Sequence, residues 1–244
     1  KITSHVSAYC QPPQQGGKQI CCEQISLTTG KNGIAHLPGA LLPLLLPDLP
    51  VFMCCPPSSL VDMPPFEKVL QLVDRVVLDT PLIYKELDVL ITTANQIHTM
   101  DEATLLSDMV WGRMTVWREA IAQLFDSPDD RANLNNLQQV EITSSDNVFS
   151  FPAFLLAFWL ATRLEWQLDS FDENNKHLVF VDKNQENIRI QFKGENTVRK
   201  AGRLLNVKLI SANKTVYQCK YVDSKLKTMI DSARENSFDY IKED

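Results

Sequence analysis

The first 166 residues contain short apolar runs whose period changes between that of a strand and that of a helix. Lys18–Leu27 and Arg75–Asp79 are predicted strands, and Pro50–Cys55 is a predicted buried strand. Directly before Arg75, the segment Phe66–Asp74 repeats apolar residues at i, i+3 and i+4, which predicts a helix. A strand, a helix and a strand in this order are typical of an α/β layer with a partly parallel sheet.

Signals for helix starts are strong in the middle of the chain. Thr99-Met-Asp-Glu102 matches the capping box, so a helix is predicted to begin near Met100. A glycine inside that helix, at Gly112, would cost ~1 kcal/mol. We therefore predict two helices with a break at Gly112, the second capped by Thr115 and running to Phe125.

The other elements of this part follow from the same patterns, with proline tolerated in the first turn of a helix. They are a short helix at Leu41–Leu46, a helix at Tyr84–Gln96, a turn at Ser127–Asp130, a strand at Gln139–Thr143, and a helix over Phe151–Trp166 that starts after Ser150.

After Trp166 the pattern changes to short strand-like runs. They are separated by glycine and asparagine and followed by a predicted amphipathic helix at Lys225–Arg234. A polar segment near 167–175 marks the predicted boundary, which gives an α/β domain over 1–170 and an antiparallel sheet with a C-terminal helix over 171–244. The expected fold class is therefore mixed α/β, with a small α+β module at the end. The four runs are His177–Asp182, Asn187–Phe192, Arg203–Ser211 and Thr215–Val222.

Composition narrows the function classes. The hydrophobic fraction of 44% and the charged fraction of 22% are ordinary for a globular protein in water. A formal net charge of −6 and the absence of a Lys/Arg run argue against a nucleic-acid partner. Prolines interrupt the most apolar stretch, Leu37–Met53, which argues against a membrane span, and we expect a cytoplasmic protein.

Known catalytic and cofactor motifs are missing from the sequence. It contains no phosphate-binding loop, no Gly-x-Gly-x-x-Gly turn, no Gly-x-Ser-x-Gly elbow and no zinc-binding spacing. The four histidines are scattered, and Asp129 and Asp130 lie in the predicted turn, where solvated carboxylates are common. We therefore predict no catalytic residue, no metal and no cofactor.

The cysteines leave a redox role open. A chain of this length does not need disulfides, so buried free thiols are the expected state of the six cysteines. Neighbouring side chains on a strand point to opposite faces, which argues against a bond within the adjacent pair Cys21 and Cys22. Cys10, Cys21 and Cys22 are the candidates for a thiol-based regulator.

The densest cluster of recognition-type residues lies between Asp108 and Glu119. Tryptophan and arginine, which alternate here, are the residues most enriched among interface hot spots. Two interpretations stay open: a surface for an acidic partner loop or a phosphate, or a structural cluster with Trp117 in the core and the arginines paired to Asp108 or Glu119. The candidate partner-binding residues are Asp108, Trp111, Arg113, Trp117 and Arg118.

At these residues the chain resembles the bacterial glucose-6-phosphate dehydrogenase assembly protein family (OpcA). The segments that carry the resemblance occur in the family's order and span most of residues 6–166. They are Val6–Cys10, Gln19–Ile25, Leu46–Phe52, Phe66–Asp79, Asp108–Glu119 and Phe125–Asp126.

The resemblance implies a non-enzymatic factor that binds glucose-6-phosphate dehydrogenase and promotes its active oligomer. It would thereby support NADPH production in the oxidative pentose phosphate pathway. The residues alone leave two other functional classes open. They are a small-molecule-binding or enzymatic α/β domain with a cleft between its modules, and a thiol-based redox regulator.

Overall fold

The computed structural model describes residues 2–11, 20–46, 48–55, 73–80, 83–84, 105–145, 149–198, 200–231 and 234–239. The contacts divide the chain into two compact units, the first made of 1–76 with 100–106 and the second of 77–99 with 107–244. The helices predicted for Phe66–Asp74 and Tyr84–Gln96, and the capping box at Thr99, fall largely or wholly outside the described residues.

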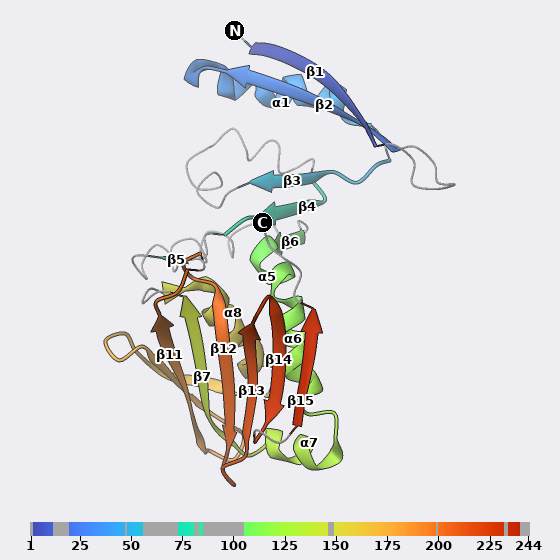
Figure 1. Ribbon diagram of the computed structural model, residues 1–244. Coiled ribbons are helices and arrows are strands. Elements are labelled where there is room, and N and C mark those ends of the chain that lie inside the picture. Colours follow the sequence, from blue (N-terminus) through green and yellow to red (C-terminus); the bar gives the residue numbers. More distant parts are fainter. Residues whose placement is uncertain are drawn as a thin grey trace. The chain divides into compact units, whose positions relative to one another are not determined.

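The first unit begins with a long antiparallel hairpin (Figure 1). Strand β1, Ile2–Gln11, pairs with β2, Ile20–Thr29, which confirms the strand predicted for Lys18–Leu27. A helical segment follows where a short helix was expected, although it begins earlier than Leu41. Its parts are a 3₁₀ helix η1 at Lys31–His36, α1 at Leu37–Leu41 and a 3₁₀ turn η2 at Leu42–Leu44.

A small three-stranded sheet has the order β3-β4-β6. Its strands are β3, Phe52–Cys55, β4, Arg75–Leu78, and β6, Leu105–Asp108. The two predicted strands are confirmed, but Phe52 is 57% exposed, so the expectation that the first would be buried is wrong. β6 occupies positions where a helix was predicted, because Leu105 to Asp108 extends the sheet before the helical segment begins at Met109.

The second unit is organised around an eight-stranded sheet of order β15-β14-β13-β12-β7-β11-β10-β9. Only β7 and β11 pair in parallel among the registers described, and the other pairs are antiparallel, so the sheet is mixed as expected for the fold class. The strands are β7, Leu137–Ser145, β9, Gln167–Asp172, β10, His177–Val181, β11, Asn187–Glu195, β12, Leu204–Ser211, β13, Val216–Val222, β14, Lys225–Ile230, and β15, Arg234–Asp239. A short pair, β5 at Ile83–Tyr84 and β8 at Phe149–Ser150, lies apart from this sheet.

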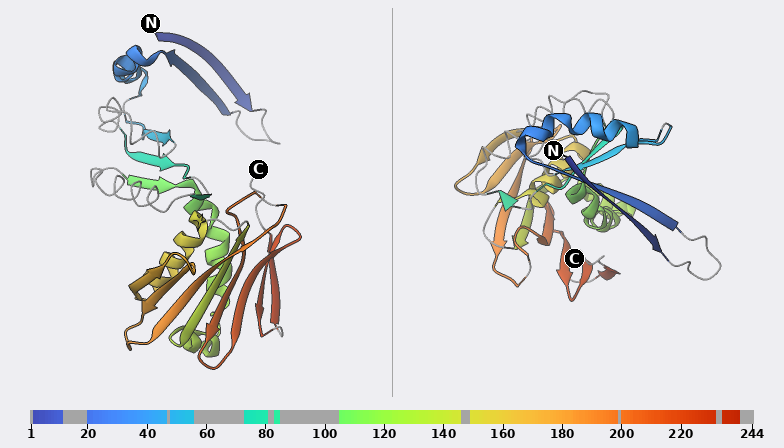
Figure 2. Two further views of the ribbon diagram at one scale, coloured as in Figure 1. Left: turned by 90° about the vertical axis from the view of Figure 1, so that its left-hand side faces the viewer. Right: turned by 90° about the horizontal axis from the view of Figure 1, so that it is seen from above.

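Helices cover one face of this sheet, as Figures 1 and 2 show. This layer is formed by α6, Thr115–Gln123, and α8, Phe151–Arg163, whereas the short helices α5, Met109–Arg113, and α7, Pro128–Leu134, lie at the ends of the strands. As predicted, α8 starts after Ser150, whose hydroxyl accepts a hydrogen bond from the Ala153 N–H. No helix among the described residues is both long enough and apolar enough to cross a membrane.

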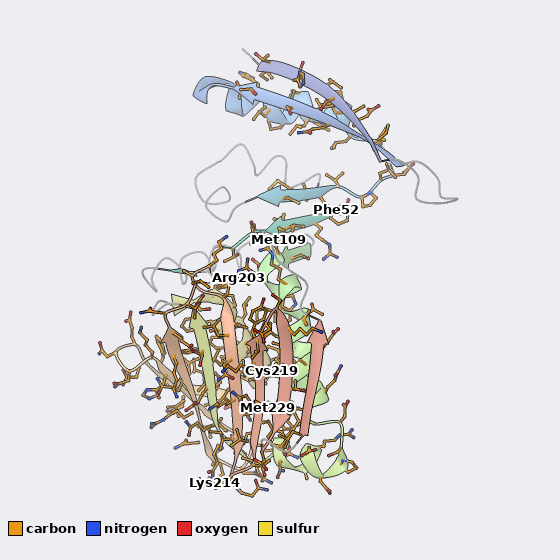
Figure 3. The ribbon with its side chains drawn as sticks, viewed as in Figure 1. Phe52, Met109, Arg203, Lys214, Cys219 and Met229 are labelled. Carbon is orange, nitrogen blue, oxygen red and sulfur yellow. The ribbon has the colours of Figure 1, made fainter. Side chains whose placement is uncertain are left out.

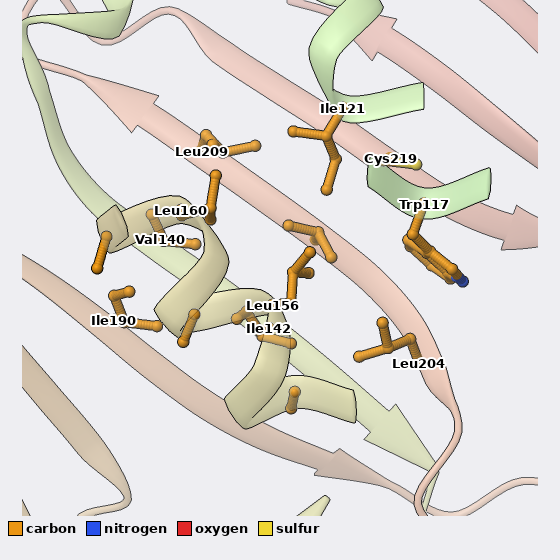
Figure 4. Packing of buried hydrophobic residues seen from close by; sticks show 14 of the residues in the cluster. Trp117, Ile121, Val140, Ile142, Leu156, Leu160, Ile190, Leu204, Leu209 and Cys219 are labelled. Carbon is orange, nitrogen blue, oxygen red and sulfur yellow. The ribbon is translucent and has the colours of Figure 1, made fainter. Parts of the chain in front are cut away.

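The core lies between α6, α8 and the covered face of the sheet (Figure 4). Alternate residues of the central strands are fully buried there, including Val140 and Ile142 of β7 and Val207 and Leu209 of β12. Burial of apolar surface at about 25 cal/mol per Å² makes this layer the main source of stability for the unit.

Two predictions about the C-terminal part are wrong. The segment predicted as a closing helix forms β14, because it buries alternate residues, Leu226 and Thr228, and leaves Lys225 and Lys227 on the opposite face. The expected boundary near 167–175 falls inside the second unit, where the polar segment forms β9. β7, from before that boundary, lies in the sheet between β11 and β12, so residues 171–244 do not form a separate module.

The predicted turn at Ser127–Asp130 is instead the first turn of α7. Ser127 caps this helix, because its hydroxyl accepts a hydrogen bond from the Asp130 N–H. Asp130 is buried, and its carboxylate accepts a hydrogen bond from the Tyr217 hydroxyl at 3.0 Å. The same hydroxyl accepts a bond from Asn133 at 2.7 Å, so α7 is fixed to β13 by a buried polar network.

Candidate functional site

The five candidate residues Asp108, Trp111, Arg113, Trp117 and Arg118 lie where β6 leads through α5 into α6. We call the segment 108–118 the helix junction. Two helices occur here, as predicted, but the break lies at Met114 and not at Gly112. A Cβ at Gly112 would meet no atom within 4 Å, so neither the break nor local packing requires glycine there. Thr115 is the first residue of α6, and its predicted capping role is wrong because Met114 takes the capping position.

Asp108 begins the junction by capping α5. Its backbone is extended, and its Oδ1 accepts hydrogen bonds from the N–H groups of Val110 at 2.7 Å and Trp111 at 3.3 Å. Its other carboxylate oxygen accepts a hydrogen bond from the buried Thr80 hydroxyl. Asp108 is therefore a structural residue that ties the start of α5 to the segment after β4.

Replacement of Asp108 by alanine is expected to lower the free energy of unfolding by about 1–2 kcal/mol, since a helix cap and a side-chain hydrogen bond are both lost. Asp108→Asn keeps a cap acceptor and should lose less. A double-mutant cycle with Thr80→Val, followed by urea unfolding, measures the pair. Additive effects of the two substitutions would mean that the Thr80–Asp108 bond contributes nothing.

Arg118 and Trp111 form a stacked pair across the break. The guanidinium carbon of Arg118 lies 3.6 Å from the centroid of the Trp111 ring, a close cation–π contact. One guanidinium nitrogen donates to the Thr115 hydroxyl at 2.9 Å and to the Trp111 carbonyl at 3.3 Å. The stack therefore joins α5 to α6 and holds the half-buried Trp111 ring in place.

The Arg118 guanidinium is held in an unfavourable setting for a cation. Burial lowers its pKa, the nearby Glu119 carboxylate raises it, and the Arg163 cation lowers it again. Its Nε is buried without a hydrogen-bond partner among the described residues. Burial of a charged group without full hydrogen bonding costs free energy. The cation–π stack on Trp111 offsets part of this cost for Arg118.

Trp117 and Arg113 occupy opposite environments. Trp117 is 1% exposed and belongs to the core, as one of the two interpretations expected. Arg113 forms an ion pair with Asp79 at 3.1 Å, and the two side chains are 34% and 58% exposed. Asp108 and Glu119 were the expected partners of the arginines. For Arg113 this expectation is wrong, because its partner is Asp79.

The surface of the junction thus consists of Trp111, Arg113 and a residue that the sequence reasoning missed, Met109. Met109 is 41% exposed, Trp111 and Arg113 are half-buried, and Gly112 between them is exposed. Met109 and Arg113, four residues apart, lie on one side of α5, and Trp111 lies on another. A thioether, an indole and a guanidinium are side chains suited to contact with a protein partner. The sequence placed Met109 in a predicted helix two residues before Trp111, and the apolar pattern alone does not mark it as exposed.

The cysteines differ from the expected buried thiols. Cys10 is exposed and disulfide-bonded, and its position on β1 is directly opposite Cys21 on β2. Cys22 is opposite Tyr9. Two other cysteines are free: Cys54 is exposed, whereas Cys219 is buried and burial raises the pKa of its thiol. Of the three cysteines whose side chains the structure describes, Cys219 alone matches the expected buried free thiol.

A shallow polar hollow of about 510 Å³ lies beside β9 and β10. Its carboxylates come from Glu165, Asp169 and Asp182, and no histidine lines it. The described residues contain no group of three or more histidine, cysteine, aspartate and glutamate side chains placed to hold a metal.

Two domain families match the chain, and together they span nearly its whole length. Residues 1–94 match the glucose-6-phosphate dehydrogenase subunit N-terminal domain, and residues 104–234 match the C-terminal domain of the same subunit. The interval between them lies close to the division of the chain into two units.

Similar proteins include two cyanobacterial proteins named OxPP cycle protein OpcA. The one from Synechocystis sp. is 28% identical over 229 residues, which are 89% of this chain and 47% of that protein. The one from Nostoc punctiforme is 29% identical over 203 residues, covering 79% of this chain and 42% of that protein. The chain therefore spans about half the length of these relatives or slightly less.

Among solved structures, an oxidoreductase from Sinorhizobium meliloti has a similar fold. The TM-score is 0.51 at 11% sequence identity, and the match covers 87% of this chain and 63% of that one. At this identity the likeness concerns the fold alone.

Proposed function

Because the chain belongs to the OpcA family of glucose-6-phosphate dehydrogenase assembly proteins, we propose that it is a non-enzymatic factor that binds this dehydrogenase and promotes its active oligomer. Family membership ties its role to the dehydrogenase and to the oxidative pentose phosphate cycle. The proposed consequence is increased NADPH production, in the cytoplasm. The match to both domains of the family is the observation that carries the proposal.

An assembly factor of this kind acts by differential affinity. It has to bind the active oligomer more tightly than the inactive form, because a ligand with equal affinity for both forms shifts nothing. Moving an equilibrium from 1:99 to 99:1 requires a ratio of affinities of about 10⁴. A large interface with a few strongly contributing residues can supply such a difference.

The exposed part of the helix junction is the first proposed contact. Met109, Trp111 and Arg113 are the apolar and cationic side chains of α5 that are exposed or half-buried, and the Arg118 stack holds Trp111 in place. Ordered aromatic and arginine side chains lose little conformational entropy on binding. We propose that the partner contacts Trp111 and Arg113 directly, while Asp108, Trp117 and Arg118 support them from within.

The test is a spectrophotometric assay of NADPH formation with limiting dehydrogenase from the same organism. Addition of this protein should raise the rate until the dehydrogenase is saturated, whereas this protein alone with glucose 6-phosphate and NADP⁺ should form no NADPH. An equal amount of serum albumin controls for nonspecific stabilisation. An unchanged rate and an unchanged KM at every ratio would contradict the proposal.

Redox regulation of the assembly factor is a second candidate, favoured by the exposed, disulfide-bonded Cys10. Reduction would break the disulfide of Cys10, which lies on β1. The activating effect measured before and after treatment with dithiothreitol, in the wild type and in Cys10→Ser, tests this candidate. An identical response in all four samples would remove it.

A further inference from the structure

The first unit buries little of its apolar surface. Among the described residues between 2 and 55, no large apolar side chain is buried, and the described core cluster lies wholly in the second unit. The described part of the chain exposes eleven large apolar side chains, and seven of them belong to the first unit, although it is the smaller one. Figure 3 shows one of them, Phe52, on β3. The seven are Val6, Ile25, Leu42, Leu44, Leu46, Leu49 and Phe52.

The ribbon formed by β1 and β2 is amphipathic, although it is largely exposed on both faces (Figure 1). Val6 is 63% exposed, and Ile25 directly opposite it is 40% exposed. Glu23 is the only charged residue on their face, because side chains alternate along each strand. The apolar residues that share this face are Ile2, Val6, Ala8, Ile25 and Leu27. Between them on the opposite face, the three facing pairs are polar throughout: Thr3–Thr28, His5–Ser26 and Ser7–Gln24.

A ribbon of two strands is marginally stable in water by itself. It becomes stable when further strands extend its apolar face or when other elements cover that face. The exposure of Val6 and Ile25 shows that the described part of the chain leaves the middle of the apolar face open. The ribbon therefore has an incomplete apolar layer, and its sheet has room for additional strands.

The outer edge of β1 has none of the features by which proteins keep sheet edges from pairing. In the described part of the chain β1 pairs with β2 alone, over ten residue pairs without a bulge, and it contains no proline, lysine, arginine or carboxylate. β9, an edge strand of the eight-stranded sheet, differs because a bulge interrupts its pairing and it carries Asp169 and Asp172. The edge of β2 is less suited to pairing, because β2 carries Glu23 and η1 packs against it.

A second copy of β1 fits this edge. An antiparallel copy meets no like charge, since β1 contains neither lysine or arginine nor a carboxylate. A two-fold axis perpendicular to the sheet keeps each face on its own side, so the apolar faces of the two ribbons join. Val6 lies near the middle of β1. With the axis there, the apolar pair Ile25–Val6 continues through the partner's Val6 to the partner's Ile25.

We propose that the protein forms a symmetric dimer in which the edges of two β1 strands pair antiparallel, so that two ribbons become one four-stranded sheet. Such a sheet extends the apolar face beyond the two strands at which a hairpin is marginal. The seven exposed side chains offer several hundred Å² of apolar surface for further contact, which is of the order of the about 800 Å² that each partner of a stable interface buries. This contact is independent of the proposed function, because it joins two copies of this chain.

Sedimentation equilibrium of the full chain tests this contact. The wild type should follow a monomer–dimer equilibrium, and Val6→Lys should weaken it at least about tenfold, because two lysines replace apolar side chains at the axis. Val6→Glu should weaken it likewise, whereas an equimolar mixture of the two variants should form a heterodimer. Leu168→Lys is the matched control, because Leu168 is a 51% exposed apolar residue of the edge strand β9. The control should dimerise as the wild type does.

Hydrogen exchange followed by mass spectrometry covers the case in which a substitution unfolds the ribbon. When the wild type is diluted from dimer to monomer, the amides of β1 should lose protection and those of β7 should keep it. A wild type that stays monomeric at every concentration, or a folded Val6→Lys protein that dimerises as the wild type does, would overturn the inference and leave the assembly role intact. Protection of the β1 amides only after addition of the dehydrogenase would also overturn it, since that edge would then belong to the dehydrogenase.

Discussion

Replacement of Trp117 by alanine is expected to lower the free energy of unfolding by about 3–5 kcal/mol, the usual cost of deleting a large buried aromatic side chain. Trp117 is 1% exposed and is the largest fully buried side chain in the part of the chain that the structure describes. It lies on the inner side of α6 near Leu204 and Cys219, between the helix and the sheet (Figure 4). The cavity left by its removal would separate α6 from the strands.

Urea unfolding followed by circular dichroism measures this loss. Phe158→Ala is a matched control, because Phe158 is an aromatic side chain of α8 that is 44% exposed. The control should lose clearly less stability than Trp117→Ala. A Trp117→Ala protein as stable as the wild type would show that α6 does not pack on the sheet as described.

Truncation of the exposed junction is expected to reduce the affinity for the dehydrogenase by tenfold or more. Removal of one hot-spot side chain costs ≥ ~1.4 kcal/mol of binding free energy, which is a factor of about ten. Arg113→Ala is the cleaner probe, because its ion pair with Asp79 is exposed and such pairs contribute only ~0–1 kcal/mol to stability. Trp111→Ala also removes the stack under Arg118, so a loss of stability of about 1 kcal/mol accompanies its loss of binding.

Activation curves of the dehydrogenase with each variant check this expectation, and melting temperatures separate binding from folding. Arg131→Ala is the matched control, since Arg131 is an exposed arginine of α7 away from the junction. Arg113→Ala should shift the midpoint of activation and Arg131→Ala should not. Equal midpoints for all variants would make the junction a purely structural feature.

Elements whose apolar pattern has one strong period could be predicted from the sequence. α8 follows a clear cap at Ser150, and β10 to β13 alternate or form short apolar runs between turn residues. Lys225–Ile230 was misjudged, because six residues with two buried side chains satisfy the strand period and, together with the residues that follow, also suggest a helix. Pairing with β13 decides the outcome, and pairing is a tertiary contact.

Prediction of the candidate site from the sequence was limited in the same way, by contacts between residues far apart in the chain. The cluster of tryptophan and arginine could be located from sequence, and the core position of Trp117 was one of two interpretations. The partners of Arg113 and Asp108 could not be predicted, because Asp79 and Thr80 lie about thirty residues away along the chain and reach the junction only through the fold.

The central claim is that this protein binds the dehydrogenase and favours its active oligomer. Sedimentation velocity measures this most directly, with the dehydrogenase at a concentration where it is partly dissociated. We predict that addition of this protein moves the dehydrogenase into a larger species that contains both chains, in parallel with a rise in the rate of NADPH formation. An unchanged size distribution, with no species that contains both chains, would contradict the account.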